Sequence, residues 1–338
     1  MQILKKGLVI SIFLFGFLPA FATDNSFKLD FNGDGRTDLA LYREGSRAPG
    51  SAPQPSVWYF IDSLTGNPFQ IHWGQTLDVP APGDFDGDGI TDVGIYRWWD
   101  FATGDTNEWW VRKSSGGHQV LLSLEPGYNK FNRNYLGDAK AEIGQLYQVD
   151  ISQNPGENCF ISVYFITDLA FNALRKTVGN VCNSVPTPVP GDYNNDGRSE
   201  IAIFENHTFK VWLPPYTPGY SVPDIVQPLD IDIPTPGDYD GDGKTDFSGV
   251  KIQNGRMLWR IKSSISGNPF EMDFGLATDK PVPGDYDGDG RSDIAVWRPS
   301  DGSWWMSLTS TSSISVYVYG LPTDTPLAMP VIPFDPIF

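Results

Sequence analysis

The 338-residue sequence predicts an all-β protein built from repeated units, and three observations support this prediction. One acidic segment recurs along the chain at intervals of 46 to 54 residues. Each copy is followed by short apolar strands, one of them rich in aromatic residues, with a polar turn after it. No window of the sequence shows the sustained 3.6-residue apolar period of a helix.

The acidic segments share the pattern D-x-[DN]-x-D-G-x-x-[DE] followed by a strand. They are DFNGDGRTDLALYR from Asp30, DFDGDGITDVGIYR from Asp84, DYNNDGRSEIAIFE from Asp192, DYDGDGKTDFSGVK from Asp238 and DYDGDGRSDIAVWR from Asp285. The gap from Asp84 to Asp192 is twice the first gap, and a degenerate copy, GDAKAEIGQLYQ, starts in its middle near Asp138. The repeats therefore begin near residues 30, 84, 138, 192, 238 and 285, as in repeat architectures.

The rest of each unit also recurs. Aromatic strands start at Val57, Glu108, Lys210, Met257 and Ser303, and the turns SLTGNPF and SISGNPF follow two of them. Three or four strands in about 50 residues match a propeller blade better than a solenoid coil. We therefore predict a β-propeller of four-stranded antiparallel blades with aromatic side chains packed between blades. The chain ends where a seventh loop would start, which predicts six blades, with seven as the alternative.

The amino terminus has the pattern of a secretory signal peptide. Lys5 and Lys6 precede an apolar stretch, and Ala20-Phe21-Ala22 forms an A-x-A cleavage site. The apolar run is short for a membrane anchor, which is the alternative interpretation. We expect residues 1–22 to be removed, residues 23–338 to form a single propeller domain, and the protein to be secreted, periplasmic or on the cell surface, without membrane insertion.

Cys159 and Cys182 are the only cysteines. An exported protein with two cysteines is expected to pair them, and closing the loop between them would contribute ~3 kcal/mol to stability. Two unpaired thiols are the alternative. The three histidines show no ligand spacing to the cysteines, so a zinc site is not expected.

The acidic loops have the composition of a calcium site. Oxygen atoms at positions 1, 3, 5 and 9, counted from the first Asp, would converge if Gly at position 6 lets the backbone curl, and position 7 would add a carbonyl. Such an all-oxygen cage suits Ca²⁺ better than Mg²⁺. The side-chain ligands would be Asp30, Asn32, Asp34, Asp38, Asp84, Asp86, Asp88, Asp92, Asp192, Asn194, Asp196, Glu200, Asp238, Asp240, Asp242, Asp246, Asp285, Asp287, Asp289 and Asp293. The backbone ligands would be Arg36, Ile90, Arg198, Lys244 and Arg291.

These loops are not EF-hands, because position 12 carries no Glu and a strand follows in place of a helix. The degenerate loop from Asp138 to Glu142 is too short and contains a lysine, so we expect no ion there. The prediction is thus about five Ca²⁺ ions with a mainly structural role. An ion that also takes part in ligand binding is the alternative.

The motifs resemble the FG-GAP/VCBS repeat family, which occurs in integrin α-subunit propellers and in many exported bacterial proteins. The FG element survives as Phe274-Gly275 and the GAP element as Ala81-Pro82-Gly83 and Val282-Pro283-Gly284. The resemblance covers nearly all of residues 24–338 and implies a calcium-bearing propeller. The departures are the degenerate third unit and four substituted loop positions, namely Asn32, Asn194, Asn195 and Glu200.

The net charge of −17 argues against nucleic acid and against anionic lipid as partners. The sequence contains no nucleophile elbow, phosphate loop or dinucleotide fingerprint. We therefore expect a monomeric, non-enzymatic module for adhesion or binding to a protein or a glycan. The alternatives are a carbohydrate-active enzyme, either a polysaccharide lyase or a glycosidase, and a purely structural surface component. The candidate contact residues are Trp98, Trp99, Phe101, Tyr216 and Tyr220.

Overall fold

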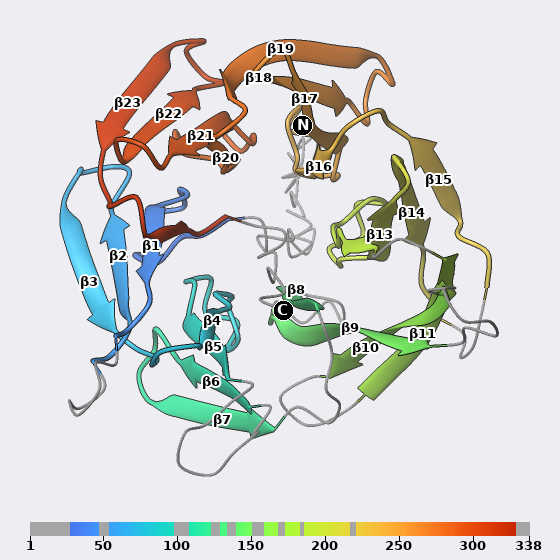
Figure 1. Ribbon diagram of the computed structural model, residues 1–338, viewed down its shortest axis with the longest axis horizontal. Coiled ribbons are helices and arrows are strands. Elements are labelled where there is room, and N and C mark those ends of the chain that lie inside the picture. The colour runs from blue at the N-terminus through green and yellow to red at the C-terminus, as the bar shows by residue number, and fades with distance from the viewer. Residues whose placement is uncertain are drawn as a thin grey trace, which may run out of the picture.

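The computed structural model describes residues 28–46, 54–97, 108–122, 129–133, 140–150, 159–167, 173–182, 186–216 and 221–328. In these residues the chain forms twenty-four strands, which are arranged as four-stranded sheets around a central axis (Figure 1). Every strand pairing is antiparallel, and each sheet is a meander of strands that follow one another in the ring. The predicted all-β propeller of four-stranded antiparallel sheets is therefore confirmed.

Within each sheet the strands follow one another in space from the inner to the outer edge of the ring (Figure 1). The first sheet contains β24 (Thr325–Pro326), β1 (Leu39–Arg43), β2 (Val57–Ile61) and β3 (Pro68–His72). The second contains β4 (Val79–Pro80), β5 (Val93–Arg97), β6 (Glu108–Arg112) and β7 (His118–Leu122). The third contains β8 (Asn129–Arg133), β9 (Glu142–Asp150), β10 (Cys159–Thr167) and β11 (Ala173–Cys182).

The remaining sheets follow the same order. The fourth contains β12 (Thr187–Pro188), β13 (Ile201–Glu205), β14 (Thr208–Trp212) and β15 (Ile225–Pro228). The fifth contains β16 (Ile233–Pro234), β17 (Phe247–Gln253), β18 (Arg256–Lys262) and β19 (Pro269–Leu276). The sixth contains β20 (Lys280–Pro281), β21 (Ile294–Arg298), β22 (Ser303–Ser307) and β23 (Ile314–Val318).

Five of these sheets are regular blades, each with a two-residue first strand, an acidic loop and then three longer strands. The sheet β8–β11 departs from this pattern, because its first strand has five residues and the others have nine or ten. It is built from the degenerate third repeat. The structure thus has five regular blades, whereas the sequence predicted six blades or, alternatively, seven. The number of sheets reaches six only when the divergent sheet β8–β11 is counted with the regular blades. The described residues form no seventh sheet.

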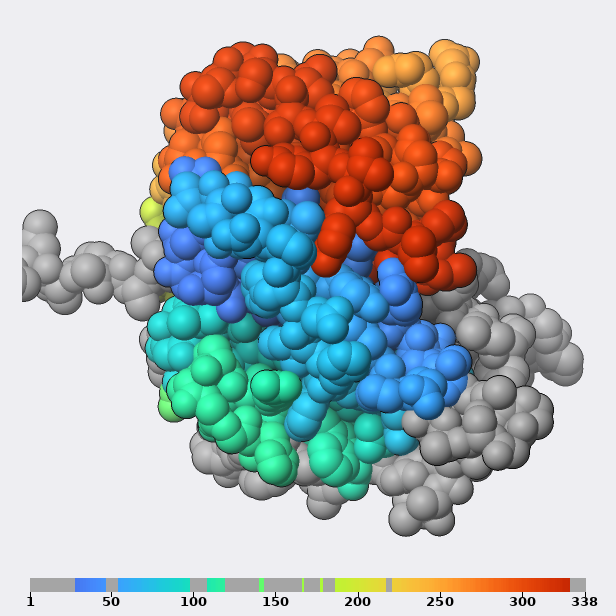
Figure 2. All heavy atoms as spheres, turned by 90° about the vertical axis from the view of Figure 1, so that its left-hand side faces the viewer, coloured from blue at the N-terminus to red at the C-terminus, as the bar shows by residue number. Residues whose placement is uncertain are grey.

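The ring closes between the two ends of the described chain. Strand β24 pairs with β1, so that Tyr42 lies opposite Thr325 and Leu41 opposite Pro326. The N–H of Leu327 also donates to the carbonyl of Ala40 at 2.9 Å. Figure 2 shows the blue first blade directly against the red C-terminal segment. The C-terminal tail therefore completes the first blade. This agrees with the prediction that a tail without its own acidic loop would meet the first repeat.

The core lies between neighbouring blades and is filled by the aromatic strands, as predicted. Trp259 of β18, for example, is fully buried against Ile294 and Val296 of the following blade. Its indole N–H donates to the carbonyl of Phe274 at 2.9 Å. The equivalent Trp residues of three other blades are also buried and are Trp58, Trp109 and Trp304. The carbonyls that accept the indole bonds belong to Trp73, Phe274 and Tyr319, and each of these residues is followed by a Gly. The recurring aromatic-Gly dipeptides of the sequence therefore mark where the buried Trp is bonded.

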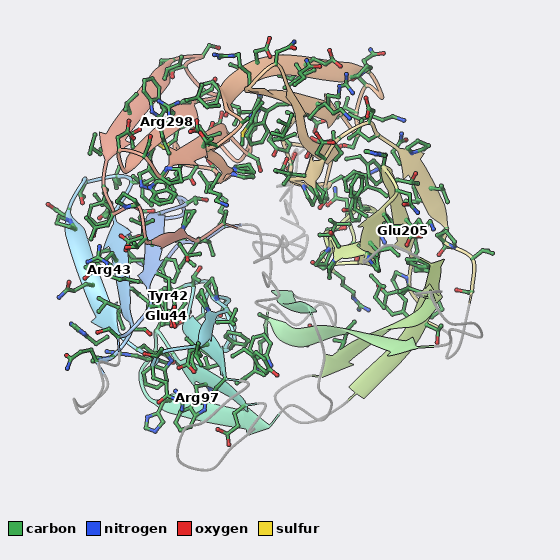
Figure 3. All side chains as sticks on the ribbon, in the orientation of Figure 1. Tyr42, Arg43, Glu44, Arg97, Glu205 and Arg298 are labelled. Atoms are coloured by element: carbon green, nitrogen blue, oxygen red, sulfur yellow. The ribbon has the colours of Figure 1, made fainter. Side chains whose placement is uncertain are left out.

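A clamp of Asp, Arg and an aromatic ring recurs in three neighbouring blades. In the first blade, the guanidinium of Arg43 donates to both carboxylate oxygens of Asp324 at 2.6 and 2.8 Å and lies 4.4 Å from the ring centre of Tyr59. Figure 3 labels Arg43 and its two equivalents in adjacent blades, Arg97 and Arg298. The matching sets are Arg97, Asp78 and Trp110, and Arg298, Asp279 and Trp305. In the first blade the clamp spans the ring closure.

Substituting Asp324→Asn should lower the free energy of unfolding by about 1–3 kcal/mol, because a buried carboxylate would lose its charge-assisted bonds to Arg43. Urea unfolding followed by tryptophan fluorescence measures this loss. Asp230→Asn is the matched control, since Asp230 forms its ion pairs at an exposed position and should leave stability nearly unchanged. Equal stability of the two variants would show that the clamp does not hold the ring closed.

Several predictions fall on residues outside the described ranges, or only partly within them. The signal peptide, Trp98, Trp99, Phe101 and Tyr220 lie outside them. The backbone register places Cys159 directly opposite Cys182 in the β10–β11 pair, a spacing that a disulfide can span. The bond itself stays a prediction. No helix in the described part of the chain has the length and apolar character needed to cross a membrane.

Candidate metal centres

The first Asp of each acidic loop organises the loop backbone. In the first loop, the carboxylate of Asp30 accepts hydrogen bonds from the backbone N–H groups of Gly33, Asp34 and Gly35 at 2.6, 3.1 and 2.7 Å. In the second loop, Asp84 accepts from Gly87 at 2.7 Å in the same way. The chain thus curls around the first carboxylate, as an oxygen cage requires.

Two loop positions need the left-handed backbone conformation. At position 6, Gly35 has a φ of 85°, as the sequence pattern implied. At position 4, Gly33 has a φ of 81°, and in the fourth loop Asn195 takes this position with a φ of 64°. Asn is one of the few residues other than Gly that tolerates this region, which explains the departure at Asn195. The sequence pattern did not reveal that position 4 also requires a residue that tolerates a positive φ.

The carboxylate at position 9 joins the loop to a second segment. Asp92 accepts the N–H of Phe85 within its loop at 2.8 Å and the N–H of Ser114 at 2.7 Å. Ser114 belongs to the turn between β6 and β7, so the loop and this turn meet at one side chain. The corresponding turn residues of the first, fifth and sixth repeats donate to position 9 in the same way and are Ser63, Ser264 and Thr309.

Four of the position-9 carboxylates are buried to an extent that disfavours their charged form. Burial raises the pKa of Asp38, Asp246 and Asp293 to about 7, and that of Asp92 to about 6. Nearby loop carboxylates add to the rise, because like charges disfavour ionisation. A cation bound among these oxygen atoms would stabilise their ionised form.

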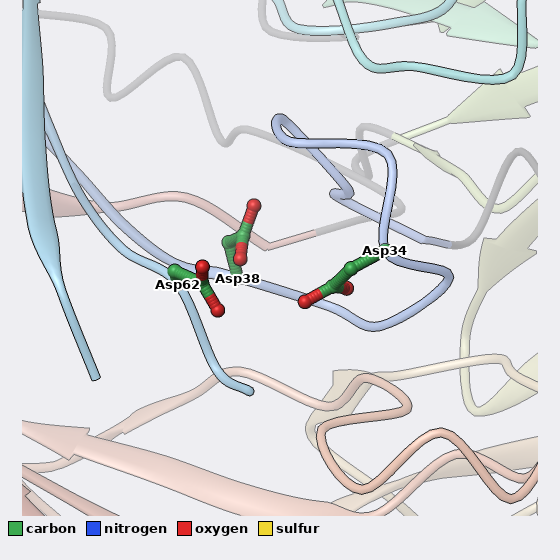
Figure 4. Close-up of side chains that lie close together, drawn as sticks. All are labelled: Asp34, Asp38 and Asp62. Atoms are coloured by element: carbon green, nitrogen blue, oxygen red, sulfur yellow. The ribbon is translucent and has the colours of Figure 1, made fainter. Parts of the chain in front are cut away.

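Among the residues that the structure describes, five acidic clusters could hold metal ions, one in each regular blade. Within each cluster, one carboxylate oxygen from every member lies within 4.8 Å of the others. The clusters are Asp34, Asp38 and Asp62 (Figure 4); Asp84, Asp86 and Asp92; Asp192, Asp196 and Glu200; Asp238, Asp240 and Asp246; and Asp285, Asp287 and Asp289. All but one of these residues were predicted as ligands from the repeat pattern.

Asp62 is the residue that the sequence pattern did not reveal. It lies in the turn between β2 and β3, far along the chain from Asp34 and Asp38, and Figure 4 shows the three carboxylates together. Turns of other blades contribute hydroxyl groups instead. Ser114 and Ser264 each donate to the position-5 carboxylate of their repeat at 2.7 Å. The recurring polar turns were the available signal, but their place beside the loops depends on the fold.

The donor set fits a hard cation. Each cluster offers three carboxylates, and the Asn side chains of the first and fourth loops and the turn hydroxyls of the second and fifth repeats lie next to them. Two buried loop oxygens, Oδ1 of Asp86 and Oδ1 of Asn194, have no hydrogen-bond partner, which is an unfavourable state that a cation would relieve. Oxygen-only sites of this charge favour Ca²⁺ among the common divalent ions. The predicted carbonyl ligands at position 7 stay predictions.

The degenerate loop of the third repeat is described only in part. In the third repeat, Lys140 is exposed and Glu142 is buried, whereas residues 134–139, including Asp138, lie outside the described ranges. The expected absence of an ion there stays a prediction.

Tyr216 packs against the apolar cluster around Trp212, and its hydroxyl accepts the N–H of Ile201 at 3.2 Å. Its packing role is thus favoured over its predicted role as an exposed contact.

Comparisons with known proteins leave the family unassigned. No protein-family model matches the chain, and no curated protein matches it. Among solved structures, the chain is similar to a crystal structure of a protein from Lactobacillus plantarum, with 8% sequence identity and a TM-score of 0.37. The similarity covers 87% of this chain and 96% of that one. At this TM-score the similarity carries no weight beside the geometry of the loops.

Proposed function

We propose that this chain is an exported, calcium-binding β-propeller of the FG-GAP/VCBS type that acts as a non-enzymatic binding module for a protein or a glycan. The observation that carries the proposal is the recurrence of acidic clusters at equivalent places in five blades. The divergent sheet β8–β11 completes the ring without an ion. The expected signal peptide places the mature protein outside the cytoplasm, where calcium is available to the loops.

The proposed role of each ion is to brace its blade. Each loop leads into the second strand of its blade, and in four repeats its position-9 carboxylate accepts a hydrogen bond from the turn between the third and fourth strands. An ion bound by the loop would therefore hold three parts of one blade together. Because an ion that binds only the folded state stabilises it, calcium would add stability in proportion to its occupancy.

Ligand binding would use surfaces other than the loops. The clustered carboxylates of the described residues lie in the acidic loops or, for Asp62, in the adjoining turn, and we assign them to ions rather than to catalysis. The acidic character of the sequence is thus largely explained by metal binding. It gives no reason to expect a nucleic acid or a membrane as the partner.

A glycan array probed with the mature protein, in calcium and in chelator, tests the binding role. We expect saturable binding of a glycan or of an exported protein, without release of cleaved product, and loss of binding when chelation loosens the blades. An Asp240→Ala variant, which lacks one proposed ion, should keep binding in calcium. Depolymerisation of a polysaccharide by the wild-type protein would overturn the non-enzymatic assignment.

Isothermal calorimetry of the mature chain should find about five bound Ca²⁺ ions, because five loops carry an acidic cluster. Asp240→Ala should remove one ion, since Asp240 belongs to the cluster of the fifth blade. Asp230→Ala is the matched control in the same part of the chain, because Asp230 is exposed and belongs to no cluster. A stoichiometry of one or none, or an unchanged count in Asp240→Ala, would contradict the ligand assignment.

A further inference from the structure

The acidic loops are bonded to one another around the ring. The N–H at position 8 of one loop donates to the carbonyl of the first Asp in the loop of the preceding blade. Thr91 donates to Asp30 at 2.6 Å, and Thr245 donates to Asp192 at 2.7 Å. The same bond joins Ser292 to Asp238, Thr37 to Asp285 and, from the degenerate loop, Ala141 to Asp84 at 2.6, 2.7 and 2.6 Å.

Both partners of this bond are tied to ion ligands. The acceptor is the backbone of the first Asp, whose carboxylate organises its loop. The donor, at position 8, stands between the proposed carbonyl ligand at position 7 and the carboxylate at position 9. Position 8 is Ser or Thr in all five intact loops, and Thr37, Thr91, Ser199, Thr245 and Ser292 are all buried.

Side chains reinforce the contact between loops. Cδ1 of Ile90, at position 7 of the second loop, lies 3.1 Å from the point that a Cβ on Gly33 of the first loop would occupy. Arg36 covers Gly288 and Arg291 covers Gly241 in the same way, with Cγ at 3.1 and 3.0 Å. Each of these position-7 side chains therefore packs on the position-4 glycine of its neighbour, so the two loops cannot rearrange independently.

Lys28 adds a link between the sixth and first loops. Its Nζ lies 2.7 Å from Oδ2 of Asp285 in the sixth loop and donates to the carbonyl of Gly35 in the first loop at 3.0 Å. Together with the backbone bond from Thr37 to Asp285, Lys28 connects the loops on either side of the boundary between the sixth and first blades.

We infer that the five ion sites form a linear array in which the binding of one ion favours binding in the neighbouring loops. The array runs from the fourth loop through the fifth, sixth and first to the second, and the degenerate third loop separates its ends. An ion that orders one loop fixes the carbonyl to which the next loop is bonded, so the next ion meets ligands that are already ordered. This inference rests on the proposed calcium-binding function, and we expect each filled neighbour to raise affinity about 5-fold or more.

Native mass spectrometry of the mature chain, titrated with calcium, tests the array because it counts the molecules with each number of ions. Asp287→Ala removes the middle site and leaves two separate pairs, whereas Asp86→Ala removes an end site and leaves four contiguous sites. Both variants lose the same side chain at loop position 3 and should bind four ions. Near half saturation, the two-ion species should make up a smaller fraction of the molecules in Asp86→Ala than in Asp287→Ala, and the ion-free and four-ion species a larger one.

Independent sites would give the two variants the same distribution of species, and that result would overturn the array while leaving five wild-type ions and the proposed function intact. A wild-type protein that binds no calcium would instead overturn the proposed function. A second comparison uses Ile90→Ala against Ile314→Ala, the same change at an exposed position of β23. Ile90→Ala should keep five ions but enrich the four-ion species, and a distribution identical to that of Ile314→Ala would contradict the proposal.

Discussion

Removal of calcium is expected to lower the free energy of unfolding of the mature chain by more than any single substitution. An ion held at 100 times its dissociation constant contributes about 2.7 kcal/mol, so five ions that each contribute this amount would add about 13.5 kcal/mol. The five loops contain 18 of the 41 acidic residues. If residues 1–22 are removed as predicted, the loss of Lys5 and Lys6 would make the charge of the mature chain −19, and five ions would change it to about −9.

Differential scanning calorimetry in calcium and in chelator, at equal ionic strength, measures this effect. Equal ionic strength matters because salt alone screens repulsion between the loop carboxylates. Magnesium at the same concentration is the second control, and it should restore less stability because it prefers to keep its water ligands. A melting temperature that is the same in calcium and in chelator would mean that the ions do not brace the blades.

The second large effect is expected from Trp259→Ala, which should lower the free energy of unfolding by about 3–5 kcal/mol. Trp259 is fully buried between two blades, and its indole donates to the carbonyl of Phe274. The substitution would leave a cavity and an unpaired buried carbonyl. Urea unfolding monitored by circular dichroism gives the change.

Trp305→Ala is the matched control for this substitution. Trp305 lies on the neighbouring aromatic strand, but it is only partly buried and packs beneath Arg298. Its loss should therefore cost clearly less stability. Equal losses in the two variants would contradict the view that the buried Trp positions hold adjacent blades together.

The repeat pattern was sufficient to predict the propeller but not the character of every blade. The recurring acidic segments fix where each regular blade begins, and the alternation in the aromatic strands indicates which side chains enter the gaps between blades. The pattern also predicted that the C-terminal tail would meet the first repeat, and β24 pairs with β1 as expected. The strands of the third repeat could not be predicted as accurately, because they are longer than those of the other repeats and the loop before them is degenerate.

The candidate sites were predicted less completely than the fold. The candidate ligands within each loop follow a fixed spacing, so they could be named from the sequence. Asp62 and the turn hydroxyls come from another segment of the blade, and their approach to the loop depends on the sheet. The bond from Thr91 to Asp30 crosses a blade boundary, and no local pattern encodes such a contact. The Ser or Thr at position 8 was visible in the sequence, but its bond to the preceding loop becomes apparent only when the blades are arranged in the ring.

The most direct test of the calcium assignment is an anomalous difference map from crystals of the mature chain grown with calcium. We expect five peaks, one in each loop that begins at Asp30, Asp84, Asp192, Asp238 or Asp285, and no peak in the third repeat. A map without peaks among these carboxylates, at calcium concentrations that saturate the protein, would contradict the assignment.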